Sequence, residues 1–169
     1  MSRTAIGSIA LVLLASLQGE AQETNVGPLT SLRQTNIVVE PLNEAAKTVG
    51  LSKENLESQL LVGLRRDIPR LTVRESAVPV LYLQVTALQE TNVGGQESGF
   101  SVSVLLGMLR PVMIREDVGV GEVTFTMATV WWKTALLVGS RTSMRKQVKD
   151  EINEKLTEFA ADYYRQNPQ

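Results

Sequence analysis

The segment Phe100-Ser-Val-Ser-Val-Leu-Leu-Gly-Met-Leu-Arg110 decides the fold that this sequence predicts. From Phe100 to Met108 every second residue is apolar, which is the period of a β-strand with one buried face. The opposite face is not cleanly polar, because Leu105 and Leu109 lie on it. A sheet that is covered on one side only should alternate between apolar and polar residues. We therefore expect part of the second face to be covered by the chain itself, by another copy or by a partner.

Strand patterns of the same kind flank this segment. Residues 80–88 alternate in the same way and are joined to it by a polar, glycine-rich hairpin loop at 92–99. Residues 123–138 form a later strand, which ends in the apolar run Ala135-Leu-Leu-Val138. Two shorter strand-like stretches precede them, at 31–40 and 71–74. The sequence thus predicts about five strands, of which the last three form an antiparallel meander.

Two amphipathic helices complete the pattern. Ser52 is placed to cap the first helix, which ends before Pro69, and Gly63 within it permits close packing. The second helix begins near Ser140. The apolar faces contain Leu56, Leu60 and Leu64 in the first helix, and Met144, Val148, Ile152, Leu156, Phe159 and Tyr163 in the second. The order of elements predicts an α+β fold, a two-layer sandwich in which a mostly antiparallel sheet of about five strands carries two helices on one face.

The N-terminus has the pattern of a secretory signal peptide. Arg3 precedes an uncharged apolar run, and Gly19 and Ala21 are small residues at the positions that a signal peptidase inspects. The apolar run is shorter than the roughly 20 residues that span a bilayer. A buried N-terminal helix and a retained anchor are the alternatives. We expect a signal peptide at 1–21, a flexible lead-in at 22–30 and a single α+β domain at 31–169. The product is then exported, periplasmic or secreted, with no stable membrane span after cleavage.

The composition excludes several classes of chemistry. Seventeen Lys and Arg balance eighteen Asp and Glu, and the net charge of -1 gives no field that would attract nucleic acid. The chain has no Cys and no His, which removes thiolate sites and the commonest general base and metal ligand. Glu116, Asp117 and Glu122 gather near one turn but lack the spacing of an EF-hand loop. We therefore expect no enzymatic activity, no metal, no cofactor and no nucleic-acid partner.

The second sheet face is the candidate binding surface. Trp131 and Trp132 are neighbours on a strand and must point to opposite faces, so one enters the core and the other lies on the second face or at its rim. Two purely structural tryptophans are the favoured alternative to an interface anchor. The predicted interface residues are Leu105, Leu109, Trp132, Leu136 and Val138.

Four arginines form a weaker candidate. Arg65, Arg66, Arg70 and Arg74 lie within ten residues, and arginine binds phosphate through two parallel hydrogen bonds. They predict an anion-binding patch. The favoured alternative is that they are charges at a helix C-terminus followed by a solvated strand, because the chain is nearly neutral and no aromatic residue interleaves them.

Several segments together resemble a group of small exported bacterial proteins of unknown function. The resemblance rests on Thr35-Asn-Ile-Val-Val-Glu40, on Gly50-Leu-Ser52 opening the leucine-rich helix, on Pro79-Val-Leu-Tyr-Leu-Gln-Val85 and on Ala128-Thr-Val-Trp131. It continues through the last helix to Phe159, Tyr163 and Asn167-Pro168, and so covers most of the chain after the leader. It implies a strand-helix-strand, three-strand meander and C-terminal helix, similar to envelope modules that dock onto other proteins. It implies no catalytic or ligand residue.

Three functional hypotheses follow. The first is a non-catalytic exported domain that binds an envelope protein or associates with itself through the apolar second face. The alternative is a small-molecule or lipid carrier with an apolar pocket between sheet and helices. The third, and least favoured, is a hydrolase that uses only carboxylate or hydroxyl groups.

Overall fold

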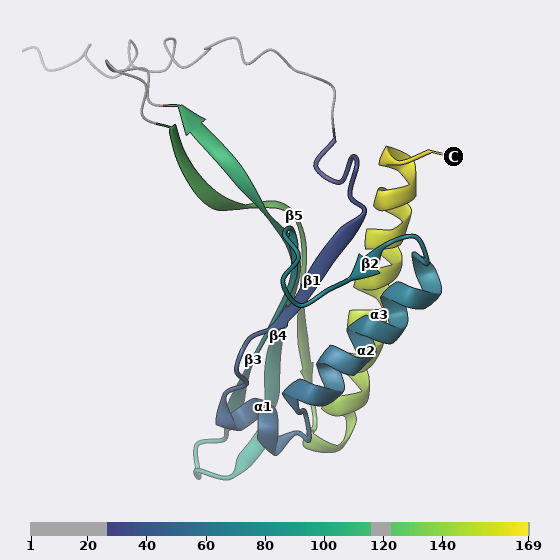
Figure 1. The fold of residues 1–169 in the computed structure, drawn as a ribbon. Coiled ribbons are helices and arrows are strands. Elements are labelled where there is room, and N and C mark those ends of the chain that lie inside the picture. The colour runs from purple at the N-terminus through teal and green to yellow at the C-terminus, as the bar shows by residue number, and fades with distance from the viewer. Residues whose placement is uncertain (1–26, 116–122, 169) are drawn as a thin grey trace, which may run out of the picture.

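The structure is a computed structural model that describes residues 27–115 and 123–168. Within these ranges the chain forms five strands and three helices (Figure 1). In chain order they are β1 (Gln34–Val39), α1 (Glu44–Thr48), α2 (Lys53–Asp67), β2 (Thr72–Val73), β3 (Val80–Thr91), β4 (Glu97–Arg115), β5 (Val123–Gly139) and α3 (Arg141–Gln166). The predicted α+β fold is confirmed.

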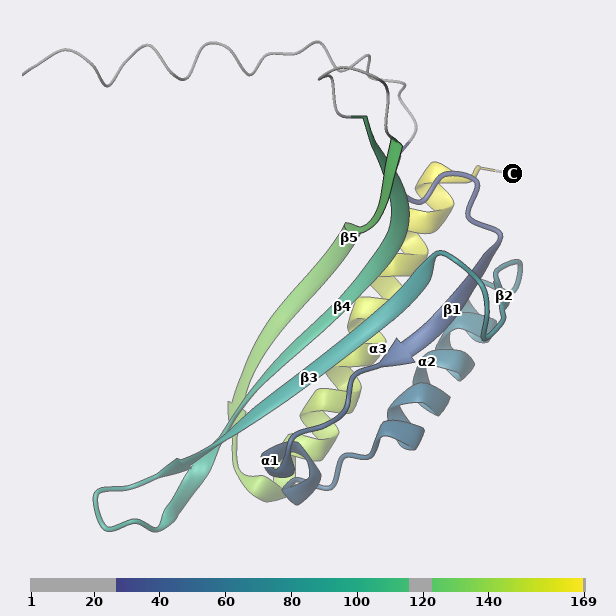
Figure 2. The same cartoon turned by 60° about the vertical axis from the view of Figure 1, so that its left-hand side comes forward.

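The strands form one mixed sheet in the order β2-β1-β3-β4-β5. β1 runs parallel to both of its neighbours, whereas β3, β4 and β5 are antiparallel, as the meander predicted. α2 and α3 lie side by side along one face of the sheet (Figures 1 and 2). No helix in the described part of the chain covers the other face of β3, β4 and β5. The molecule therefore has two layers, with one sheet face left open.

Local sequence signals explain where the helices lie. The Ser52 side chain accepts a hydrogen bond from the Asn55 amide at 3.3 Å, as expected of the cap of α2. Ser140 occupies the cap position of α3 but makes no side-chain bond to a helix amide. Gly63 lets α2 approach α3 closely, because a Cβ at this position would lie 2.6 Å from Leu156 Cδ1.

The core lies between the sheet and the helices. The inward residues of β3 and β4 are buried, and β5 contributes Trp131, whose ring meets Phe159 edge to face at 5.0 Å. The Trp131 Nε1–H donates to Asp162 on α3 at 2.9 Å, so its polar atom is satisfied. The inward residues are Leu81, Leu83, Val85 and Ala87 on β3, and Phe100, Val102, Val104, Leu106 and Met108 on β4.

The end of the expected lead-in is packed. Residues 28–31 form a turn in which Leu29 is fully buried. The Leu29 amide donates to Gln166 Oε1 at 2.7 Å, and Arg110 Nη1 donates to the Pro28 carbonyl at 2.8 Å. The expected flexible lead-in, residues 22–30, thus includes a segment that packs against the end of α3, and its flexibility stays a prediction. The expected signal peptide, residues 1–21, lies outside the described residues.

The helices of the described chain are all too short or too polar to cross a membrane.

Candidate functional site

The open face is the surface of β3, β4 and β5 that points away from α2 and α3. The three strands lie next to one another (Figure 2), and their register arranges the side chains of the open face in rows that cross them. The rows are Leu88–Ser101–Val138, Thr86–Ser103–Leu136, Gln84–Leu105–Thr134, Tyr82–Gly107–Trp132 and Val80–Leu109–Thr129. None of these positions holds an acidic or basic residue. These five rows are therefore an uncharged mixture of apolar and polar side chains, and the Glu90 carboxylate lies at their end, where it accepts a hydrogen bond from Ser101 Oγ.

All five predicted interface residues lie on this face. Trp132, Leu136 and Val138 on β5 are exposed, by 59%, 72% and 64% of their surface. Leu105 and Leu109 on β4 are half-buried by their neighbours. The prediction that one tryptophan enters the core and the other does not is confirmed, because only 7% of Trp131 is exposed. Whether these residues bind anything stays a prediction.

The sequence analysis missed one residue of this surface. Leu88 at the end of β3 is exposed and shares a row with Val138. The expected alternation of residues 80–88 already contained the signal, because it places Tyr82, Gln84, Thr86 and Leu88 on one face.

A shallow hollow lies in the middle of the open face. It has a volume of about 710 Å³, and Tyr82 and Trp132 line it on either side of Gly107. Gly107 has no side chain, which leaves the space between the two aromatic residues empty. A Cβ added there would make only ordinary contacts, the nearest at 3.4 Å from the Trp131 carbonyl oxygen. The hollow is thus a consequence of residue size and not of backbone geometry.

One carboxylate lies beside this hollow. Desolvation raises the pKa of Tyr82 to about 12, and the neighbouring Glu40 carboxylate adds to the effect. The Tyr82 hydroxyl therefore stays protonated at neutral pH. Lys133, the one charged residue of β5, lies on the helix side and pairs with Glu158 at 3.2 Å. The hollow thus offers apolar contact and hydrogen bonding, and Glu40 is the acidic neighbour of its Tyr82 wall.

β5 is also an edge of the sheet. It pairs with β4 on one side, and no strand of the described chain pairs with its other side. A long edge strand presents unpaired amide and carbonyl groups that can bind another strand. The seventeen residues of β5 include only one charge, and Trp132, Leu136 and Val138 all stand on this edge strand.

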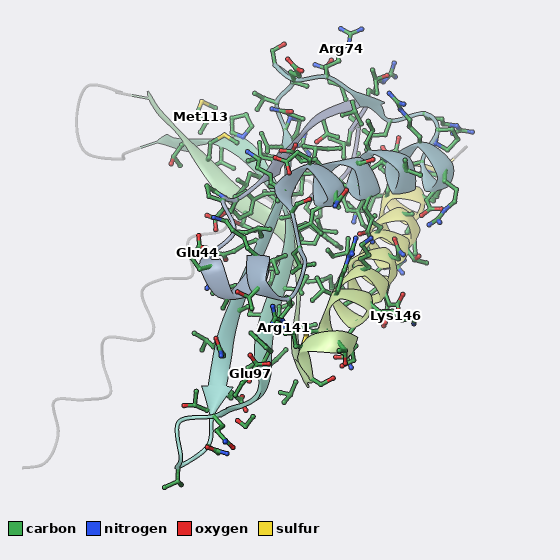
Figure 3. All side chains as sticks on the ribbon, turned by 90° about the horizontal axis from the view of Figure 1, so that it is seen from below. Glu44, Arg74, Glu97, Met113, Arg141 and Lys146 are labelled. Carbon is green, nitrogen blue, oxygen red and sulfur yellow. The ribbon has the colours of Figure 1, made fainter. Side chains whose placement is uncertain are left out.

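The four predicted arginines do not form one patch. Arg66 pairs with Asp67 at 2.6 Å, and this contact raises the pKa of Arg66 and lowers that of Asp67. Arg65 lines a hollow beside α2 that also contains Glu57 and Glu75. Arg74 lies at the periphery of the molecule (Figure 3). The structure thus does not bring the four together, because Arg65 and Arg70 line different hollows and Arg66 pairs with Asp67; that they bind an anion stays a prediction.

Arg70 is the exception among the four. It lines a different hollow, together with Arg33, which the sequence analysis did not select. The two residues lie 37 positions apart, so no local spacing could have joined them.

No potential metal site is found in residues 27–115 and 123–168, in the sense of three or more acidic side chains gathered together. Glu116, Asp117 and Glu122 lie outside the described residues.

Comparisons with known proteins give distant structural similarities. No protein-family model matches the chain, and no curated protein matches it. A PelC dodecamer from Paraburkholderia phytofirmans is 19% identical over 75% of this chain and 85% of that chain, with a TM-score of 0.41. The rare lipoprotein B from Shewanella oneidensis is 14% identical over 78% and 91% of the two chains, with a TM-score of 0.26. A minor lipoprotein from Acinetobacter baumannii is 13% identical over 81% and 91%, with a TM-score of 0.28. Bacterial lipoproteins are thus among the structures to which this chain is similar.

Proposed function

We propose that this protein is an exported, non-catalytic domain of the bacterial envelope that binds a protein surface through its open face. The observation that carries the proposal is the apolar surface of β5, where Trp132, Leu136 and Val138 are exposed on the open face. Soluble proteins rarely expose neighbouring large apolar side chains unless another surface covers them. Arg3 and the apolar run after it support export.

A second copy of this chain is the occupant that the geometry favours. Two copies related by a two-fold axis can stack open face against open face, so that Trp132, Leu136 and Val138 of each copy are covered by the other. Lys133 does not oppose this contact, because its side chain pairs with Glu158 on the helix side.

The carrier hypothesis is less well supported. It requires an apolar pocket between sheet and helices, whereas the hollow lined by Leu105, Leu109 and Trp132 lies on the other side of the sheet. Buried core side chains such as Leu106 and Phe159 occupy the region between β4 and α3. A bound small molecule would have to sit in the open hollow.

Sedimentation velocity of the mature protein over a range of concentrations tests the proposal. We expect a reversible dimer that Leu136→Glu converts to a monomer with an unchanged circular dichroism spectrum. Val62→Glu is the matched control, because Val62 is 61% exposed on α2, on the helix side of the molecule. It should leave the dimer intact.

Three results would contradict the proposal of self-association. The wild-type protein could stay monomeric at every concentration, or Val62→Glu could dissociate it as strongly as Leu136→Glu does. A native mass spectrum of protein purified from its own host could show a retained small molecule on a monomer, which would support the carrier hypothesis. If the wild-type protein is a monomer and binds an envelope protein that the Leu136→Glu variant does not bind, that envelope protein is the partner and not a second copy.

A further inference from the structure

A second hollow lies at the end of the molecule where α3 terminates. It has a volume of about 550 Å³, and the residues lining it come from three parts of the chain. Arg33 precedes β1, Arg70 lies between α2 and β2, and Tyr163 belongs to the last turn of α3. Ser31 and Thr72 add hydroxyl groups to the lining. The hollow is thus bordered mainly by hydrogen-bond donors.

The positive charges of Arg33 and Arg70 have no carboxylate partner among the described residues. No acidic residue lines the hollow, and neither Arg33 nor Arg70 has a carboxylate within 4.0 Å among the described residues. Burial of Tyr163 raises the pKa of its hydroxyl, while the positive charges of Arg70 and Arg33 lower it. Both guanidinium groups therefore act on the same small volume. Because burial dominates, the Tyr163 hydroxyl stays protonated at neutral pH and remains able to donate.

One wall of the hollow is held in a costly conformation. Ser31 has φ of 60°, in the left-handed region that residues other than glycine rarely adopt. Its amide donates to Asn167 Oδ1 at 2.8 Å, and Asn167 Nδ2 donates in turn to the Leu29 carbonyl at 2.8 Å. The same Nδ2 also donates to the Tyr163 carbonyl at 2.9 Å. The turn is thus fixed against the end of α3. Strained backbone of this kind persists where surrounding bonds hold it, and it concentrates at binding sites.

We propose that this hollow binds a phosphate group, which Arg33 and Arg70 hold between them. A guanidinium presents parallel N–H donors that match two oxygens of a phosphate, and the hydroxyl of Tyr163 supplies a further donor. Two such guanidinium groups suit a tetrahedral anion with several oxygens better than a single carboxylate. The phosphate comes from a free phosphate ester or from the headgroup of an anionic phospholipid. The site is independent of the open face, because its residues belong to other elements.

Isothermal titration calorimetry of the mature protein with inorganic phosphate and with glycerol phosphate tests this site. Sodium chloride at equal ionic strength is the reference. We expect saturable binding that Arg33→Gln and Arg70→Gln each weaken at least tenfold. Arg74→Gln is the matched control, because Arg74 lies on the same segment as Arg70 but outside the hollow. It should change the affinity by less than twofold. Both arginines are exposed, so the variants should keep the wild-type melting temperature, which is measured alongside.

Flotation with vesicles distinguishes the two sources of phosphate. A lipid headgroup is identified if the protein binds vesicles that contain phosphatidylglycerol but not pure phosphatidylcholine vesicles, and if Arg33→Gln abolishes this binding. Binding of glycerol phosphate without flotation identifies a free ester. The proposal is overturned if neither probe binds, or if Arg74→Gln weakens binding as much as Arg70→Gln does.

Discussion

The same strands form both faces of the sheet, but one face is covered by helices and the other is open. On β4, Val104 and Leu106 face the helices and are fully buried, while Ser103 and Leu105, which alternate with them, face outward. The covered face is apolar from Leu81 to Ala87 on β3 and from Phe100 to Met108 on β4. On the open face, Leu136 on β5, Leu88 on β3 and Val138 on β5 are exposed by 72%, 66% and 64%. The covered face thus forms the core, whereas the open face exposes large apolar side chains on both strands that flank β4.

The largest expected difference between the faces comes from one substitution made on each. Leu106→Ala removes a fully buried side chain from the covered face and should lower the free energy of unfolding by about 2–5 kcal/mol. Leu136→Ala, on the open face, should change the stability of the monomer by less than about 0.5 kcal/mol. Urea denaturation at low protein concentration measures both. Equal losses would mean that the open face is part of the core of a single chain.

Two glycines, one in the helix layer and one on the open face, should give intermediate changes in stability of opposite sign when each is replaced by alanine. Gly63→Ala gains about 1 kcal/mol in helix propensity, but the new Cβ would meet Leu156 at 2.6 Å inside the packed layer. Overpacking costs about 1–3 kcal/mol, so we expect a net loss of about 1 kcal/mol.

Gly107→Ala places its methyl group in the open hollow and restricts the unfolded chain, so it should stabilise the fold by about 0.5 kcal/mol. The difference in melting temperature between the two variants is the measurement. If Gly63→Ala were the more stable variant, α2 and α3 would not be in close contact at this point.

The smallest effect concerns the two adjacent tryptophans. Trp132→Phe should change stability by less than about 0.5 kcal/mol, because most of the side chain is exposed. The same variant should remove most of the fluorescence that acrylamide quenches, since Trp131 is shielded by Phe159. Quenching of the wild-type protein should decrease as its concentration rises if a second copy covers Trp132. If acrylamide quenches Trp132→Phe and Trp131→Phe equally, the assignment of the two tryptophans to opposite faces is contradicted.

Local patterns predicted the elements of this fold and the face on which each residue lies. Alternation along residues 80–88 and 100–108 placed Leu81 and Leu106 in the core, and the stripe of the last helix placed Phe159 there. These signals depend on residues two to four positions apart. The order of the strands in the sheet is set by pairing between distant segments, so periodicity could not give it.

The candidate sites show the same limit. The five predicted interface residues were found because strand alternation is local. Arg33 was missed because it meets Arg70 only through the folding of β1 against β2. The packing of residues 27–30 was not predicted for a related reason, since Leu29 is buried beside the end of α3, which is more than a hundred residues away in the sequence.

The hydrogen bonds that join Leu29 to Gln166 and to Asn167 bring the beginning and the end of the described fold to the same pole. Domains built in this way often tolerate circular permutation. A short linker between residues 27 and 168, with new termini opened in the exposed hairpin turn at 92–96, should therefore preserve the sheet. It also means that any tether attached before residue 27 would hold the C-terminal end of α3 near the same anchoring surface, with the 92–96 turn directed away from it (Figure 2).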